Sequence, residues 1–200
     1  MIVAVLGAGG HAKVLVATLQ AAGIEVIGLF DDDRSRHGSE VLGVRVRGDV
    51  EDSLREKCPL VIGVGSNRAR QALTQRIAGE FISVVHPRAV VHPSAKIGAG
   101  SVVFAGAVIQ PDTVLGEHVI VNTSASLDHD CRIGKFAHVG PGVHVCGGVD
   151  IGEGALLGVG SAVIPGRRVG EWVVLGAGSV VTKDVEPGQT VVGVPAKPRS

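Results

Sequence analysis

The chain has 200 residues, enough for one large domain or two small ones, and its 19 basic residues balance its 19 acidic ones. Such an even charge gives no sign of a nucleic-acid or anionic-membrane partner. With one Trp, four Phe and no Tyr, the core must be built from Val, Ile, Leu and Ala, and base-stacking platforms are not expected.

Cysteine usage and the first residues indicate a cytoplasmic protein. The cysteines are odd in number and form no CxxC pair, which favours reduced thiols at Cys58, Cys131 and Cys146. Residues 1–8 are apolar but lack the basic start of a signal peptide, so we expect a buried strand there. No stretch approaches the roughly 20 apolar residues of a membrane span.

Strands alternate with helices in the first part of the chain. The predicted strands cover residues 2–6, 25–30, 60–64 and 81–85, and the predicted helices cover about 13–22, 49–57 and 68–77. Gly23 stops the first helix, and Gly65-Ser66-Asn67 caps the last one. This order predicts a small parallel α/β domain over residues 1–85.

A glycine-rich turn follows the first predicted strand. Its sequence, Gly7-Ala8-Gly9-Gly10-His11-Ala12, fits G-x-G-x-x-A, and Asp31 ends the second strand about 20 residues later. Backbone N–H groups at such a helix start bind phosphate. Because the domain is too short for the two halves that a whole NAD needs, we expect a half-Rossmann unit that binds the nucleotide-diphosphate part of another ligand. A tight turn without a ligand is the alternative.

This turn and the neighbouring loops supply the candidate substrate contacts. They are Gly9, Gly10, His11, Gly65, Asp31 and Asp32. The glycines and the histidine would meet phosphate or sugar. The two aspartates would accept hydrogen bonds from ribose hydroxyls or a base N–H, or else form a solvated acidic turn.

A six-residue repeat dominates the second part of the chain. Every sixth residue from Val91 to Val181 is Val, Ile or Leu, and the fourth residue after most of them is small. A period of six fits neither a helix nor a hairpin protein, but it fits short strands joined by tight turns, three strands to a coil. Residues 18 positions apart would then stack on one face. The pattern resembles the left-handed parallel β-helix of the hexapeptide acyltransferases, and we predict that fold for residues 86–200.

One repeat carries charges where the others are mostly neutral. His129 stands between Asp128 and Asp130. Acyl transfer from a thioester needs a base with a pKa near neutral, which histidine supplies, and a carboxylate raises the basicity of its ring. We therefore expect His129 to be a catalytic base. Asp130 is the better placed partner, and the sequence leaves Asp128 open.

The chain as a whole resembles the nucleotide-sugar acetyltransferases of the sialic acid O-acetyltransferase and bacillosamine or perosamine N-acetyltransferase group. The resemblance rests on residues 7–14, Asp31-Asp32, Asn122-Thr123, residues 128–131 and residues 193–197. It implies a nucleotide-sugar acceptor on the N-terminal domain and acetyl-CoA between two subunits of a homotrimer. His129 would be the base and Asp130 its partner, at a position where bacillosamine enzymes often carry Glu.

The same resemblance implies further roles near the base. The acceptor would attack the thioester directly, without an acyl-enzyme, and a backbone N–H near Gly147 would stabilise the oxyanion. His138, nine residues after His129, would contact the acetyl-CoA end of the site. Asn122 would contact the substrate.

The remaining cofactor contacts come from small residues and the basic tail. Gly158-Val159-Gly160 and Gly176-Ala177-Gly178 lie 18 residues apart, so they would stack into a smooth wall for a pantetheine arm. Lys197, past the last coil, would meet CoA phosphates or lie in a solvated tail. No metal is expected.

Our prediction is an N-acetyltransferase acting on a UDP- or GDP-linked amino sugar for surface glycan biosynthesis. The main alternative is a sugar O-acetyltransferase of the sialic-acid type, and a remote one is an NAD-binding oxidoreductase. A metal enzyme like the γ-class carbonic anhydrases would draw on His118, His138 and His144, of which the last two lie on different faces. A non-catalytic solenoid would leave the Asp-His-Asp run unexplained. The sugar, the nucleotide and the choice of amine or hydroxyl stay open.

Overall fold

The computed structural model describes residues 1–199 and divides the chain into two compact units, with the division between Pro87 and Arg88. Each unit has its own hydrophobic core. Within residues 1–199, no helix is long and apolar enough to cross a membrane.

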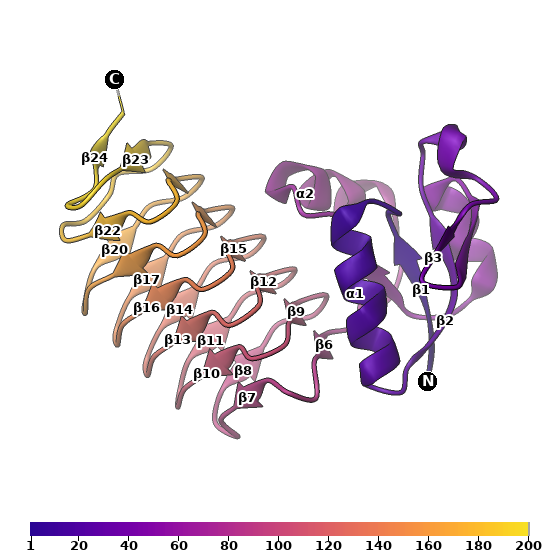
Figure 1. The fold of residues 1–200 in the computed structure, drawn as a ribbon, viewed down its shortest axis with the longest axis horizontal. Helices are drawn as coiled ribbons and strands as arrows, with labels where there is room; N and C mark the ends of the chain where they lie inside the picture. Colours follow the sequence, from indigo (N-terminus) through magenta and orange to yellow (C-terminus); the bar gives the residue numbers. More distant parts are fainter. Residues whose placement is uncertain (200) are drawn as a thin grey trace. The chain divides into compact units, whose positions relative to one another are not determined.

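The first unit is an α/β domain whose elements in chain order are β1 (Ile2–Leu6), α1 (Gly10–Ala21), β2 (Glu25–Phe30), η1 (Arg34–Arg36), β3 (Glu40–Val41), β4 (Val44–Gly48), η2 (Val50–Glu56), β5 (Leu60–Ile62), α2 (Asn67–Arg76) and β6 (Val84–Val85). The sheet has the order β3-β4-β2-β1-β5, with β3 antiparallel to β4 and the other pairs parallel (Figure 1). Central β1 is buried from Val3 to Leu6 because that run is apolar. Since β2 and β5 flank β1 on opposite sides, the carboxyl ends of β1 and β5 form a topological switch point, where open α/β sheets bind ligands.

Two of the predicted helices differ from the observed ones. The first, α1, begins at Gly10 rather than near Lys13, because Gly9 already takes the extended N-cap conformation. The predicted helix over residues 49–57 is the 3-10 helix η2, and Asp49 with Asp52 forms its capping box.

The strand pattern also departs from the prediction. Residues 40–48, for which no strand was predicted, contain the hairpin β3–β4, in which alternating Val and Arg bury Val46. The strand predicted over residues 81–85 reduces to a bridge from Phe81 to Leu60 and the two-residue β6.

The second unit is a left-handed parallel β-helix made of two-residue strands. They are β7 (Val90–Val91), β8 (Lys96–Ile97), β9 (Val102–Val103), β10 (Val108–Ile109), β11 (Val114–Leu115), β12 (Ile120–Val121), β13 (Ser126–Leu127), β14 (Arg132–Ile133), β15 (His138–Val139), β16 (His144–Val145), β17 (Asp150–Ile151), β18 (Leu156–Leu157), β19 (Ala162–Val163), β20 (Arg168–Val169), β21 (Val174–Leu175) and β22 (Val180–Val181), followed by β23 (Thr190–Val192) and β24 (Lys197–Pro198). Figure 1 shows the coils stacked from β7 to β23.

Three sheets form the faces of this β-helix. The first sheet contains β7, β10, β13, β16, β19 and β22; the second contains β8, β11, β14, β17 and β20; the third includes β9, β12, β15, β18, β21 and β23. Each strand pairs in parallel with the strand 18 residues away, as Leu127 does with Val145. The second residue of nearly every strand points inward, and these aliphatic side chains form one continuous core.

The last coil breaks the register that the sequence suggested. Val169 pairs with Val185 and Val174 with Thr190, a spacing of 16 residues instead of 18. The chain then closes the end of the β-helix with β23 and β24, which are antiparallel. This short coil explains why the six-residue ladder stops at Val181.

Candidate active site

His129 lies at a corner of the β-helix, in the turn between β13 and β14, which we call the His129 corner. Its Nδ1 lies 2.7 Å from the Oδ2 of Asp130. Asp128 has a different task, because its Oδ1 accepts the backbone N–H of His129 at 2.8 Å. The sequence left open which aspartate is the partner of His129. In the structure Asp130 contacts the ring, and Asp128 stabilises the backbone of the turn.

The electrostatics of this corner favour a basic histidine. The hydrogen bond to Asp130, with a further contribution from the charge of Asp128, raises the pKa of His129 above its ordinary value. A carboxylate can only accept a hydrogen bond, so Nδ1 carries the proton and Nε2 keeps the lone pair. Both side chains are well exposed, so Nε2 can reach a substrate.

Gly147 lies one coil further on, against the ring of His129. A Cβ at this position would lie 2.5 Å from Nε2, so any residue larger than glycine would displace the ring. Within residues 1–199, the Gly147 N–H donates no hydrogen bond to the chain, whereas the next N–H, of Gly148, donates to the His129 carbonyl. A free donor beside a basic nitrogen is the arrangement that acyl transfer needs.

Two hollows mark the surface of the β-helix. The smaller, of about 220 Å³, lies beside the His129 corner, and its polar lining comes from Gln110, Ser126, Asp128, His144 and Cys146. The larger, of about 730 Å³, follows the second sheet past Arg132 and Arg168 and contains no residue predicted to bind a ligand. The smaller hollow is therefore the one that adjoins the predicted base.

The predicted acetyl-CoA contacts lie elsewhere on the β-helix. His138 stands on β15 in the third sheet, where its Nε2 lies 3.0 Å from the Asn122 amide nitrogen. Val159 and Ala177 stack at the corner that joins the third sheet to the first, which we call the Val159 corner. Within one chain, the predicted base and the predicted wall thus belong to two different corners. Lys197 lies on exposed β24, at the end of the β-helix.

The glycine-rich turn of the first unit opens α1 as predicted. Gly9 caps the helix through its backbone alone, no acidic residue occupies the first turn, and a Cβ on Gly9 or Gly10 would meet nothing within 4 Å. The N-terminus of α1 therefore offers N–H donors to an anion over an open backbone. Gly65, after β5, places its Cα hydrogens toward His11, whose Cβ would lie 3.6 Å from an added methyl.

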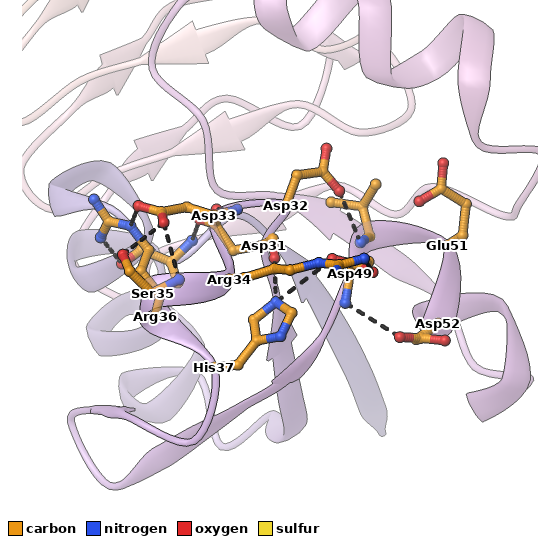
Figure 2. A network of polar contacts seen from close by, with 12 residues as sticks. Asp31, Asp32, Asp33, Arg34, Ser35, Arg36, His37, Asp49, Glu51 and Asp52 are labelled. Atoms are coloured by element: carbon orange, nitrogen blue, oxygen red, sulfur yellow. Dashed lines mark hydrogen bonds and ion pairs between the residues drawn. The ribbon is translucent and has the colours of Figure 1, made fainter.

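Asp31 has a partner that the sequence did not reveal. Figure 2 shows the network around it. Its Oδ2 accepts the Ala8 N–H at 2.7 Å, and Arg36 donates to the Ala8 carbonyl at 3.1 Å. Residues that follow β2 thus form hydrogen bonds with the backbone of the glycine-rich turn. Asp31 therefore stabilises this turn, and its hydrogen bond to a ribose stays a prediction.

Asp32 is occupied as well. Its carboxylate pairs with both Nη atoms of Arg76, at 2.7 and 2.9 Å, and accepts the Val50 N–H at 3.2 Å. Arg76 also pairs with Glu51, and the hydrogen bond from Arg76 holds the pKa of Asp32 below its usual range. The sequence analysis missed Arg36 and Arg76, because each lies in a charged stretch of the kind that is typical of a solvent-exposed surface.

The histidines of the metal alternative are engaged separately. His118 stacks on Phe136 with ring centroids 5.4 Å apart, and His144 Nδ1 lies 2.8 Å from the Ser126 hydroxyl. Within residues 1–199, no group of three or more His, Cys, Asp or Glu side chains could hold a metal ion.

Known protein families match both units. The PglD N-terminal domain family matches residues 2–77, and the hexapeptide repeat of succinyl-transferase matches residues 148–183. PerB from Caulobacter crescentus, solved with CoA and GDP-perosamine, is 41% identical, with a TM-score of 0.94 over 100% of this chain and 98% of that one. The chain belongs to this family of amino-sugar N-acetyltransferases.

Two more members of the family are similar to the chain. The acetyltransferase domain of PglB from Neisseria gonorrhoeae, solved with acetyl coenzyme A, is 40% identical, with a TM-score of 0.93 over 99% of this chain and 98% of that one. The UDP-N-acetylbacillosamine N-acetyltransferase of Bacillus subtilis is 36% identical over 110 residues, which is 50% of each chain. The match thus spans half the length of this curated relative. Family membership confirms the predicted resemblance and the acetyltransferase class.

Proposed function

We propose that the chain transfers the acetyl group of acetyl-CoA to the amino group of a nucleotide-linked amino sugar, as a step in surface glycan biosynthesis. The observation that carries the proposal is the His129–Asp130 pair, with its 2.7 Å hydrogen bond on Nδ1 and Nε2 lying against Gly147. It supplies a base, an orienting carboxylate and an oxyanion donor at one corner.

The reaction proceeds by direct attack. The acceptor amine adds to the thioester carbonyl carbon while Nε2 of His129 takes one of its protons. The Gly147 N–H then donates to the carbonyl oxygen, on which negative charge develops. When the intermediate collapses, the C–S bond breaks, the new amide remains, and the CoA thiolate receives the proton.

The acceptor carries a nucleoside diphosphate that binds to the first unit. The N-terminus of α1 and the Gly65 loop offer backbone donors, with Gly9, Gly10 and His11 at the diphosphate or sugar. Asp31 and Asp32 shape this surface through their partners. Relatives named for a GDP sugar and for a UDP sugar are both similar to the chain, so both nucleotides are candidates.

The enzyme is a homotrimer with its active sites between subunits. The base lies at the His129 corner, whereas Val159, Ala177 and His138 lie at the Val159 corner and on the third sheet. A neighbouring copy brings its Val159 corner to this base, and acetyl-CoA lies between the two subunits, with Lys197 near its phosphates. No protein-bound metal takes part. The three free cysteines suit the reducing cytoplasm, where we place the reaction.

Acetyl transfer to a panel of UDP- and GDP-linked amino sugars tests the proposal. We expect release of CoA thiol with at least one of them, and His129→Ala should lower kcat by about 10²- to 10⁴-fold because the base is lost. Size-exclusion chromatography checks that the variant keeps the assembly of the wild type. If the enzyme acetylates sialic acid and none of the sugars in the panel, O-acetylation replaces the proposed reaction. Near-normal rates of His129→Ala would refute the mechanism.

A further inference from the structure

Arg70 is a buried arginine that the reaction described above does not use. It stands in the second turn of α2, and only 2% of its surface is exposed. Its guanidinium donates to the carbonyl oxygen of Gly65 at 2.9 Å and reaches that of Val64 at 3.4 Å. The side chain therefore folds back beneath the loop that joins β5 to α2.

The burial of this charge is costly. Desolvation lowers the pKa of Arg70 to about 9, a cost that a leucine or methionine of similar volume would not incur. A buried guanidinium that fastens loop carbonyls thus points to a requirement other than filling the core.

The loop that Arg70 holds lies against the start of α1. A Cβ on Gly63 would lie 2.9 Å from that of Ala12, and one on Gly65 would lie 3.6 Å from His11. The backbone after β5 and the first turn of α1 are therefore in direct contact, side by side at the switch point. Movement of the Gly65 loop would move the surface on which a phosphate is bound.

Arg70 also sets the charge around His11. Burial, followed by the positive charge of Arg70, lowers the pKa of His11 to about 4, so this imidazole is neutral at neutral pH. Beside His11 the positive charge therefore resides on the Arg70 guanidinium rather than on the imidazole, and a positive charge there favours an anion.

We propose that Arg70 is a positioning residue for the nucleotide-sugar acceptor: it fixes the Gly65 loop against His11 and supplies the buried positive charge that a bound diphosphate faces. The inference rests on the proposed function, because it assumes an acceptor with a nucleoside diphosphate. Arg70 touches the loop carbonyls rather than the reacting atoms.

Binding of UDP and GDP to the full chain, measured by calorimetry, tests this role with Arg70→Met and Arg70→Lys. Arg70→Met should weaken binding of the nucleotide that the wild type prefers by about tenfold or more, because loop and charge are both lost. Arg70→Lys keeps the charge, so its affinity for the nucleotide should lie between those of the wild type and Arg70→Met. Arg55→Met is the matched control, since Arg55 is an exposed arginine of the same unit on η2, and it should bind within about twofold of the wild type.

Two further readouts separate positioning from general damage to the fold. The KM for the nucleotide sugar should rise in Arg70→Met while the KM for acetyl-CoA and kcat stay within about twofold. The pKa of His11, followed by NMR, should rise in Arg70→Met and stay low in Arg70→Lys. Unchanged nucleotide binding in folded Arg70→Met would overturn the inference, as would equal rises of both KM values. Failure of the wild type to acetylate any nucleotide sugar would instead count against the proposed function.

Discussion

Asp130 has a left-handed backbone conformation, with φ of 59°. Aspartate tolerates this region better than most residues, and here it brings the carboxylate beside the ring of its own neighbour, His129. The pair therefore needs no other element to form. The predicted base and the carboxylate that orients its ring are thus two consecutive residues of one corner.

Asp130→Asn tests the electrostatic role of this carboxylate. The hydrogen bond to the Asp130 carboxylate raises the pKa of His129, and the base acts in its neutral form, so kcat/KM should rise with pH through a value above the ordinary histidine pKa. Without a carboxylate at this hydrogen bond the pKa of His129 falls, so the rise of kcat/KM should move to lower pH. The plateau should also drop by about 10- to 100-fold. A full pH–rate profile gives both quantities.

Asp128→Asn serves as the control in the same profile. Asp128 is the second cause of the raised pKa, and its carboxylate faces the backbone N–H of His129 rather than the ring. Asp128→Asn should move the rise of kcat/KM to lower pH as well, but by less than Asp130→Asn does. A rise that stays in place in Asp130→Asn would contradict the assignment of Asp130.

The strands of the β-helix are elements that cannot exist alone. Each strand from β7 to β22 has two residues, of which one points inward, and its backbone hydrogen bonds go to the coils above and below. The inward aliphatic side chains therefore form a single core in which every coil depends on its neighbours. The six-residue period in the sequence is the direct trace of this arrangement.

Two neighbouring residues of β21 test the inward ladder. Leu175 is 1% exposed within the core, whereas Val174, next to it, is 39% exposed. Leu175→Ala should lower the free energy of unfolding by about 2–5 kcal/mol, because it leaves a cavity in close-packed surroundings. Val174→Ala should cost under about 1 kcal/mol. Urea unfolding of both variants gives the comparison, and equal losses would show that inward and outward positions do not differ.

At the scale of the whole molecule, the predicted base and the predicted wall for acetyl-CoA lie at two different corners of the β-helix. The His129 corner and the Val159 corner are separate edges of the β-helix of one chain. In the trimer we propose, each active site takes one corner from each of two copies. A defect in either corner would then be compensated by an intact corner of a different subunit.

Co-expression of two inactive variants tests this assembly. His129→Ala removes the base, and Ala177→Trp blocks the wall at the Val159 corner. With equal amounts of the two variants, the randomly assembled pool should regain about a quarter of the wild-type activity, because about half of the sites receive an intact base corner and about half of those also receive an intact wall. Each variant expressed alone is the control. No recovery in mixed assemblies, verified by differential tags, would place the whole site within one chain.

The sequence by itself determined the β-helix and the α/β unit before it, and it predicted His129 as the base. Periodicity survives in a single sequence because each inward position must be aliphatic, and the charged His129 run stands out against it. The G-x-G-x-x-A turn was visible for the same local reason.

Only the tertiary structure decided which partner each polar side chain takes. Asp31 bonds to Ala8 across 23 positions, Asp32 to Arg76 across 44, and Gly147 reaches the His129 ring from the next coil. The buried site of Arg70 beneath the Gly65 loop likewise has no local signature. Such contacts depend on how strands and coils are brought together. A hydrogen bond between residues that are distant in the chain produces no regular spacing in the sequence, so the sequence alone does not reveal it.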